Sequence, residues 1–266
     1  MKRPGLTITL GSGLLMVATT ASHAVNAVLT CAPDSVPVGA TCLDRYEESV
    51  WRVTDPTTTN AILVAKIQLG TATQADLVAG GATPLGTASD DYAPCASNGQ
   101  NCADDIYAVS LASVIPSANI SWFQAQEACA NSGKRLPTSA EWQMGANGTP
   151  DAGPDNGTTD CNSGSGAVTL TGGRKNCVSA RGAFDMVGNL FEWVADWVPL
   201  STGCSSWGGL SDDLMCLSGV ATAADGPGAM LRGGDFRNRA SAGPLAVVAS
   251  GTPFSAARFI GFRCTR

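Results

Sequence analysis

Two carboxylates flank a glycine-containing turn in residues 184–197, which read FDMVGNLFEWVADW. Asp185 and Glu192 stand on either side of Gly188, and a turn of this kind can wrap side-chain and main-chain oxygens around a hard cation such as calcium. The simpler interpretation is an Asx turn followed by a solvated glutamate. The residues alone leave both interpretations open.

Other acidic stretches are weaker candidates for metal binding. The run from Asp151 to Asn162 does not fit the EF-hand spacing, because no glutamate closes it. Residues 70–105 are rich in Gly, Thr, Ala and Asp, which predicts surface loops. We expect their paired aspartates to be solvated, with a calcium site as the less favoured alternative. These aspartates are Asp90, Asp91, Asp104 and Asp105.

The N-terminus has the parts of an export signal. Lys2 and Arg3 form a basic region, residues 6–18 form an apolar region, and residues 22–24 (SHA) form a small-x-small cleavage site. We therefore expect an exported protein, periplasmic, cell-surface or secreted, with no transmembrane anchor after cleavage. A retained anchor is less favoured because the apolar stretch is short, and LTC at 29–31 is a poor lipidation site.

Signal cleavage would also remove His23, the only histidine in the sequence. The mature chain would then have none. Ser-His-Asp and Cys-His catalysis are excluded on that basis, as are histidine-ligated zinc and iron.

The bulk composition limits the classes of partner. The formal net charge is −6, which argues against a nucleic-acid partner. Charged residues make up 14% of the chain and apolar residues 44%, so polarity comes mainly from small uncharged side chains. This mixture is typical of a loop-rich extracellular fold and argues against a long helical bundle.

Ten cysteines, all beyond the signal segment, predict a disulfide framework in an exported chain. Spacing cannot prove the connectivity, but it suggests local pairs and leaves two distant cysteines for one long-range bridge. The suggested pairs are Cys31 with Cys42, Cys95 with Cys102, Cys161 with Cys177, Cys204 with Cys216, and Cys129 with Cys264.

The elements that must position these groups are short. Helices are predicted over 121–131 and from 138 through 144, each opened by a capping box. Strands are predicted within 42–53, over 61–69 and near both ends of 231–264. The two tryptophans of the 184–197 segment, Trp193 and Trp197, could lie on a helix face or a strand, and we expect both to pack in the core. Residues 147–176 are predicted to be loop.

Several ordered motifs resemble the formylglycine-generating enzymes, or sulfatase-modifying factors. CANSGKRLPTSAEW at 129–142 is similar to their C…GKRLPTEAEWE segment, and DMVGNLFEWVADW at 185–197 is similar to N-I-V-G-N-x-W-E-W…D-W. DRYEESVW at 44–51, LRGGDF and the terminal GFRC also match family motifs. The resemblance implies an α+β, irregular, loop-rich, C-type-lectin-like fold.

The resemblance implies two further features. Family calcium ligands fall on the side chains of Asp185 and Glu192 and on the carbonyls of Gly188 and Leu190. A family long-range disulfide falls on Cys129 and Cys264.

The chain departs from the enzymes at their catalytic cysteine pair. The two positions that follow the GG motif hold Asn238 and Gly243, and neither residue can supply a thiolate. We therefore expect no copper and no oxidation of a substrate cysteine by the family mechanism. The alternative is a sulfatase-modifying-factor-type oxidoreductase acting on a protein cysteine with rearranged chemistry, for which Cys204 and Cys216 would be candidates.

The C-terminal segment resembles the variable proteins of diversity-generating retroelements, which keep the scaffold and display a diversified ligand-binding face. The sequence LRGGDFRNRASAGPLAVVASGTPFSAARFIGFRC has their flanks and length. Arg and aromatic side chains make strong interface contacts, and the alternative is an ordinary surface loop. The candidate contacts are Asp235, Phe236, Arg237, Asn238, Arg239, Ser241, Phe254, Arg258 and Phe259.

The predicted organisation is a signal peptide at 1–24, an N-terminal leading segment at 25–41 and a sulfatase-modifying-factor-like domain at 42–266. Residues 231–264 are the candidate ligand-display region, and residues 235–259 within it are called the display segment below. The predicted function is non-catalytic binding of a protein or glycan ligand by this segment. The remaining alternative is a structural envelope protein without a specific ligand.

Overall fold

The computed structural model describes residues 29–89, 91–103, 105–151, 153, 155–221 and 226–266. The predicted signal peptide lies outside these residues. Among the described residues no helix is both long and apolar enough to cross a bilayer.

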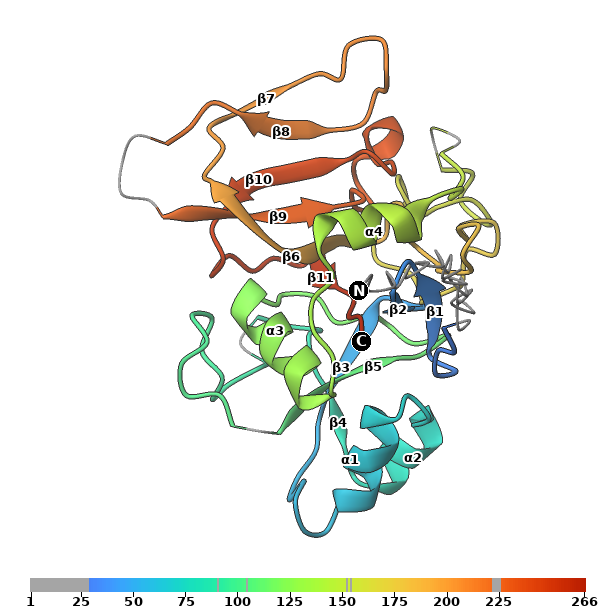
Figure 1. Cartoon of the computed structure of the whole chain (residues 1–266), viewed down its shortest axis with the longest axis vertical. Coiled ribbons are helices and arrows are strands. Elements are labelled where there is room, and N and C mark those ends of the chain that lie inside the picture. The colour runs from blue at the N-terminus through green and yellow to red at the C-terminus, as the bar shows by residue number, and fades with distance from the viewer. Residues whose placement is uncertain (1–28, 90, 104, 152, 154, 222–225) are drawn as a thin grey trace, which may run out of the picture.

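The largest sheet occupies the upper half of the molecule in Figure 1 and contains six strands in the order β11-β6-β9-β10-β8-β7. β11 pairs with β6 in parallel, as β10 does with β8, and the other pairings are antiparallel. Its strands are β6 (Phe191–Pro199), β7 (Gly203–Ser205), β8 (Met215–Ser218), β9 (Pro227–Arg232), β10 (Val247–Gly251) and β11 (Ile260–Phe262).

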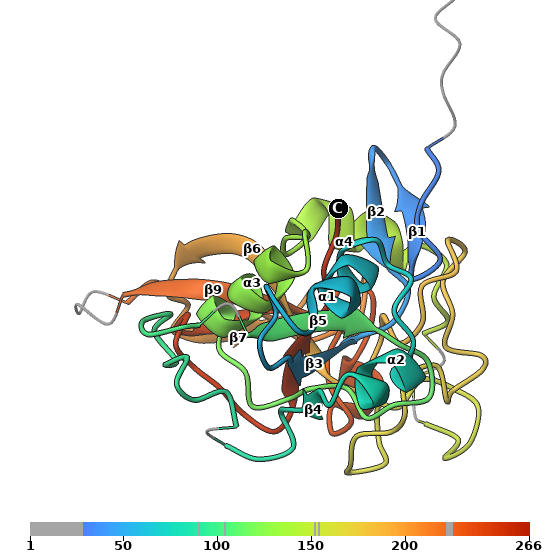
Figure 2. The same cartoon turned by 90° about the horizontal axis from the view of Figure 1, so that it is seen from below.

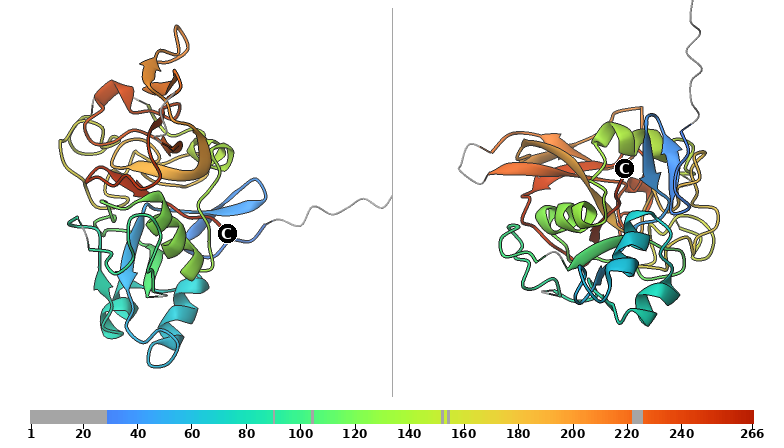
Figure 3. Two further views of the ribbon diagram at one scale, coloured as in Figure 1. Left: turned by 90° about the vertical axis from the view of Figure 1, so that its left-hand side faces the viewer. Right: turned by 60° about the horizontal axis from the view of Figure 1, so that its bottom comes forward.

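A smaller antiparallel sheet, in the order β4-β3-β5, lies below it beside two short helices (Figures 1 and 2). Its strands are β3 (Glu48–Arg52), β4 (Thr83–Pro84) and β5 (Ile106–Ser110), and the helices are α1 (Ala61–Gln68) and α2 (Gln74–Ala79). The hairpin of β1 (Ser35–Val38) and β2 (Thr41–Asp44) stands at one edge, and the C-terminus ends centrally near it (Figure 3).

Both predicted capping boxes are present. Ser121 accepts from the backbone of Gln124 at the start of α3 (Trp122–Asn131), and Thr138 accepts from Glu141 at the start of α4 (Ser139–Ala146). In each case the side chain three residues on returns the hydrogen bond, which satisfies two amide donors that a helix start leaves free.

The strand predicted over 61–69 is wrong, because these residues form α1. Leu63 and Ile67, four residues apart, are buried, while Ile62 is 78% exposed. The burial thus follows a helical period, although the apolar residues also fit a strand. The loop prediction for 70–105 likewise missed α2, whose capping box pairs Thr73 with Asp76.

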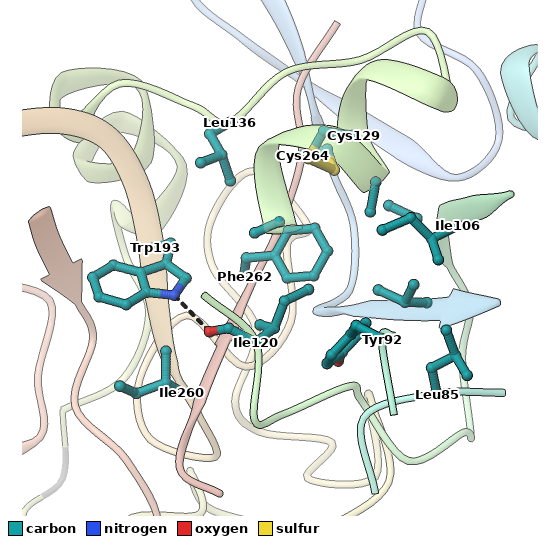
Figure 4. Packing of buried hydrophobic residues seen from close by; sticks show 14 of the residues in the cluster. Leu85, Tyr92, Ile106, Ile120, Cys129, Leu136, Trp193, Ile260, Phe262 and Cys264 are labelled. Atoms are coloured by element: carbon teal, nitrogen blue, oxygen red, sulfur yellow. Dashed lines mark hydrogen bonds between the residues drawn. A yellow bond between two sulfur atoms is a disulfide. The ribbon is translucent and has the colours of Figure 1, made fainter. Parts of the chain in front are cut away.

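The main core lies between the two sheets. Trp193 on β6 is fully buried and donates its indole N–H to the carbonyl of Ile120 at 3.0 Å (Figure 4). Phe262 and the Cys129–Cys264 disulfide pack in the same cluster. Trp193 therefore confirms the predicted core packing, whereas Trp197 is 42% exposed at the surface.

All five predicted disulfides are present, and all ten cysteines are paired in them. The predicted α+β, loop-rich, disulfide-stapled architecture is confirmed. The Cys129–Cys264 bridge spans 135 residues and joins α3 to the chain end directly after β11.

Replacing Cys129 and Cys264 by serine is expected to lower the free energy of unfolding by about 5 kcal/mol, because the long loop constrains the unfolded chain most. The Cys204–Cys216 pair, 12 residues apart, is the matched control and should cost about 3 kcal/mol in the same entropy model. Denaturant titration of the two double variants measures both. Equal losses would contradict the assigned role of the long bridge.

Candidate functional site

A fully buried ion pair joins β6 to the chain end. Arg263 donates from Nε and Nη2 to the two carboxylate oxygens of Glu192, at 2.7 and 2.6 Å. The indole N–H of Trp142 donates to the same carboxylate at 2.6 Å. Burial alone would lower the pKa of Arg263, but the charge of Glu192 outweighs it and raises the pKa above its usual value. Both oxygens of Glu192 are therefore engaged by donors.

Two further carboxylates stand near this pair. Glu47 accepts from the backbone N–H of Leu190 at 2.9 Å and from the side-chain amide of Asn189. Burial, followed by the charges of Asp185 and Glu192, raises the pKa of Glu47 well above its usual value. The buried polar cluster is thus crowded with negative charge that Arg263 only partly offsets.

The predicted calcium residues lie together in this cluster. Asp185 accepts from the backbone N–H of Gly172 at 2.6 Å, and its burial raises its pKa to about 7. Gly188 has φ +74°, and a Cβ there would lie 2.4 Å from the carbonyl oxygen of Asn162, so the turn requires glycine.

These residues do not fit a calcium cage in the hydrogen bonding described. Glu192 faces the guanidinium of Arg263, and an ion that used its oxygens would have to displace that group. Calcium at Asp185, Gly188, Leu190 and Glu192 stays a prediction.

A second buried cation lies close to the same chain end. Lys134 is fully buried and its Nζ lies 2.5 Å from Asp44, 3.4 Å from Asp34 and 3.5 Å from Glu48. Burial lowers the pKa of Lys134, but these carboxylates raise it above its usual value. Lys134 and Arg263 lie inside the quoted motifs, yet sequence reasoning assigned them no role because their partners are remote in sequence.

The aspartates predicted to be solvated are not uniformly so. Asp105 is half-buried and pairs with Nε of Arg52 at 2.9 Å. Asp91 accepts backbone N–H groups from Gly86 and Ala88. The prediction is therefore wrong for Asp105, and Asp90 and Asp104 lie outside the described residues.

Two candidate contacts of the display segment are corrected by their burial. Asp235 is fully buried and accepts from the backbone, Nε and Nη2 of Arg237. Phe236 is 1% exposed and packs against Ala118 and Leu190. Neither side chain is free to contact a macromolecule, because each holds the loop in place from beneath.

The remaining candidates reach the surface. Those classed as exposed are Arg237, Arg239, Phe254 and Arg258, and those that are half-buried are Asn238, Ser241 and Phe259. The short helix η1 (Arg239–Ser241) lies in this part of the segment.

Three of these side chains and one buried ring form a stacked group, called the arginine–aromatic patch below. Arg237 lies over the ring of Phe259, with Cζ 3.4 Å from the centroid, and Arg258 lies over Phe236 at 5.4 Å. Phe236 and Arg258 also line a pocket of about 230 Å³ together with Ile115, Pro116 and Val168. Stacking holds both guanidinium groups at the surface in defined positions.

The two positions that replace the enzyme cysteines are occupied in different ways. The side-chain oxygen of Asn238 accepts from the backbone N–H of Asp235 at 2.8 Å. At Gly243 a Cβ would lie 1.8 Å from Oδ1 of Asp213, so a carboxylate fills the space that a side chain would need. Neither position can carry thiolate chemistry.

The family comparison agrees with the motifs. Residues 94–266 match the model of the sulfatase-modifying factor enzyme 1-like domain. Together with the mixed, disulfide-stapled architecture, this match supports the predicted formylglycine-generating-enzyme-type, C-type-lectin-like fold. No curated protein matches the sequence.

The solved structures to which the chain is similar include the M1 variant of the major tropism determinant, at 19% identity and a TM-score of 0.48, covering 88% of this chain and 52% of that one. The chain therefore spans about half the length of that structure. Treponema denticola variable protein 1 matches at 21% identity and a TM-score of 0.39, over 57% of this chain and 70% of its own. PvdO from Pseudomonas aeruginosa matches at 18% identity and a TM-score of 0.37, over 85% and 80%.

Replacing Glu192 by glutamine is expected to lower the free energy of unfolding by about 3–5 kcal/mol, because it leaves the charge of Arg263 buried without its partner. Glu141 is the matched control. It pairs with Arg135, whose side chain is 45% exposed, so Glu141→Gln should cost at most about 1 kcal/mol. Denaturant titration compares the two variants, and similar small losses would contradict the structural role of the buried pair.

Proposed function

The chain belongs to the sulfatase-modifying factor enzyme 1-like family, and we propose that it is an exported, non-catalytic member that binds a protein or glycan ligand through the display segment. The observation that carries the proposal is the arginine–aromatic patch. Arg237 and Arg258 are exposed, and each guanidinium is stacked on an aromatic ring whose place is fixed by the core.

The chemistry of this patch favours an anionic group on the ligand. A guanidinium forms paired, planar hydrogen bonds with carboxylate, sulfate or phosphate oxygens. The whole chain has a net charge of −6. On this surface Arg239 and Arg258 are exposed and make no ion pair within the described chain, whereas the guanidinium of Arg237 is already paired with Asp235 through Nε and Nη2. Because stacking already orders two of these side chains, binding loses less conformational entropy than it would with free arginines.

The absence of the family's cysteine pair at 238 and 243 supports the same proposal. The disulfides leave no free cysteine among the described residues, and Cys204 and Cys216, which the enzyme alternative would need, are bonded to each other. Five disulfides also favour an oxidising compartment, which agrees with export.

Changing Arg237 and Arg258 together to serine is expected to weaken ligand binding at least about tenfold, since stacked arginines at an interface are typical hot spots. The probe is an array of neutral, sialylated and sulfated glycans, together with a pull-down of surface proteins compared between variants. Arg181→Ser removes an exposed arginine outside the segment and should leave binding unchanged. Binding that survives in the double variant would contradict the proposal.

Alkylation of the mature, denatured and unreduced chain is expected to modify no cysteine, because all ten are paired. Mass spectrometry counts the modified residues. The same preparation, supplied with copper, should leave the mass of a sulfatase-motif cysteine peptide unchanged. A pair of reactive thiols with peptide turnover would favour the oxidoreductase alternative instead.

A further inference from the structure

We propose that Asp151, Asp212 and Asp213 form a binding site for a hard divalent cation, calcium in the first instance, beside the display segment. One carboxylate oxygen from each residue lies within 4.8 Å of the other two. Asp151 comes from the loop between α4 and β6, whereas Asp212 and Asp213 come from the loop between β7 and β8. The fold thus brings together oxygens that are about 60 residues apart in sequence.

An unpartnered oxygen points to a ligand at this place. Asp213 is only 4% exposed, and its Oδ1 is buried without a hydrogen-bond partner. Its Oδ2 accepts from the backbone N–H of Leu245 at 2.6 Å, which fixes the carboxylate in position. An ionised oxygen that is buried and left unpaired costs free energy, and a bound cation would remove that cost.

The neighbouring backbone is built to admit this carboxylate. A Cβ on Gly243 would lie 1.8 Å from Oδ1 and 2.3 Å from Cγ of Asp213, so any side chain at 243 would expel it.

The electrostatics of the cluster favour a cation. The carboxylate oxygens of Asp151, Asp212 and Asp213 lie close enough together for their negative charges to repel one another. The nearby charge of Arg232 offsets part of the charge of Asp213. Arg232 makes no ion pair with Asp213 within the described chain, however, and its Nη2 donates to the carbonyl of Pro244 at 3.0 Å. The mutual repulsion of the three carboxylates therefore remains for a divalent ion to relieve.

The donor chemistry indicates the type of ion and its affinity. Three carboxylates and no sulfur or imidazole suit calcium, which takes oxygen ligands in flexible geometry and completes its shell with water. Because Asp151 and Asp212 are exposed, we expect a weak site, with a Kd of about 10⁻⁴–10⁻³ M as in extracellular modules.

The loop that holds Asp213 is hydrogen-bonded to the display segment. Leu214, next to Asp213, donates its backbone N–H to the carbonyl of Ser241 at 3.0 Å. Leu245, which donates to Asp213, lies in the same segment. An ion held by Asp213 would therefore stiffen one border of the binding face.

Isothermal titration of the full mature chain with calcium chloride tests the site, after removal of metal by a chelator. Asp213→Asn and Asp151→Asn are each expected to weaken calcium binding at least about tenfold, which corresponds to 1.4 kcal/mol. Gly243→Ala should do the same by displacing the carboxylate. Asp55→Asn is the matched control, because Asp55 is exposed and outside the cluster.

Two further variants distinguish the proposed site from loss of folding and from the sequence-predicted calcium site. Asp151 is exposed, so its variant keeps the test valid if Asp213→Asn does not fold, as circular dichroism will show. Asp185→Asn should still bind calcium. If Asp185→Asn loses calcium binding while Asp213→Asn keeps it fully, the proposal is overturned in favour of the sequence-predicted site. Equal affinity in the wild type and Asp151→Asn, or no binding heat at about 10 mM calcium, would also overturn it.

Discussion

The structure depends on the neutralisation of two buried cationic side chains that lie near the C-terminus in space. Arg263 and Lys134 are removed from water, and a charge in that position is tolerated only when it is paired and hydrogen-bonded. Glu192 neutralises the charge of Arg263, and Asp44 together with Glu48 neutralises the charge of Lys134. These partners come from β2, β3 and β6. The two sets of ion pairs therefore hold segments that are distant in sequence close together in space.

This requirement explains how a chain with short elements and long loops holds a defined shape. Arg263 also donates to the carbonyls of Asp44 and Phe184, and the next residue, Cys264, is bonded to Cys129 on α3. The last residues therefore join the hairpin, the turn before β6 and the helix. The display segment ends at β11, whose register against β6 is fixed by the same contacts.

Sequence predicted the features that rest on local chemistry. The capping boxes at Ser121 and Thr138 depend on residues three apart, and the local disulfides depend on short spacing, so both were predicted correctly. Motif resemblance supplied the family. The fold of 61–69 was predicted wrongly because the apolar residues fit two periods, and only tertiary contacts decide between them.

The candidate site was harder to predict, because burial is a property of the whole fold. In the sequence Asp235 and Phe236 are plausible ligand contacts, but in the folded chain both side chains are buried. Asp151 and Asp213 lie in loops with no recognisable metal spacing, so no sequence pattern could join them. Such a cluster of charges forms only because folding brings the two loops together.

Position 243, where the resemblance places the enzymes' second cysteine, borders the proposed cation site. A cysteine there would need the space that the carboxylate of Asp213 fills, because even its Cβ would lie 1.8 Å from Oδ1. A cysteine at 243 would therefore require the carboxylate of Asp213 to move from its observed position. In this chain the carboxylate of Asp213 fills the space beside residue 243. Cysteines placed at 238 and 243 would meet that carboxylate, so the Asp213 side chain would have to move as well before the two thiols could act as a pair.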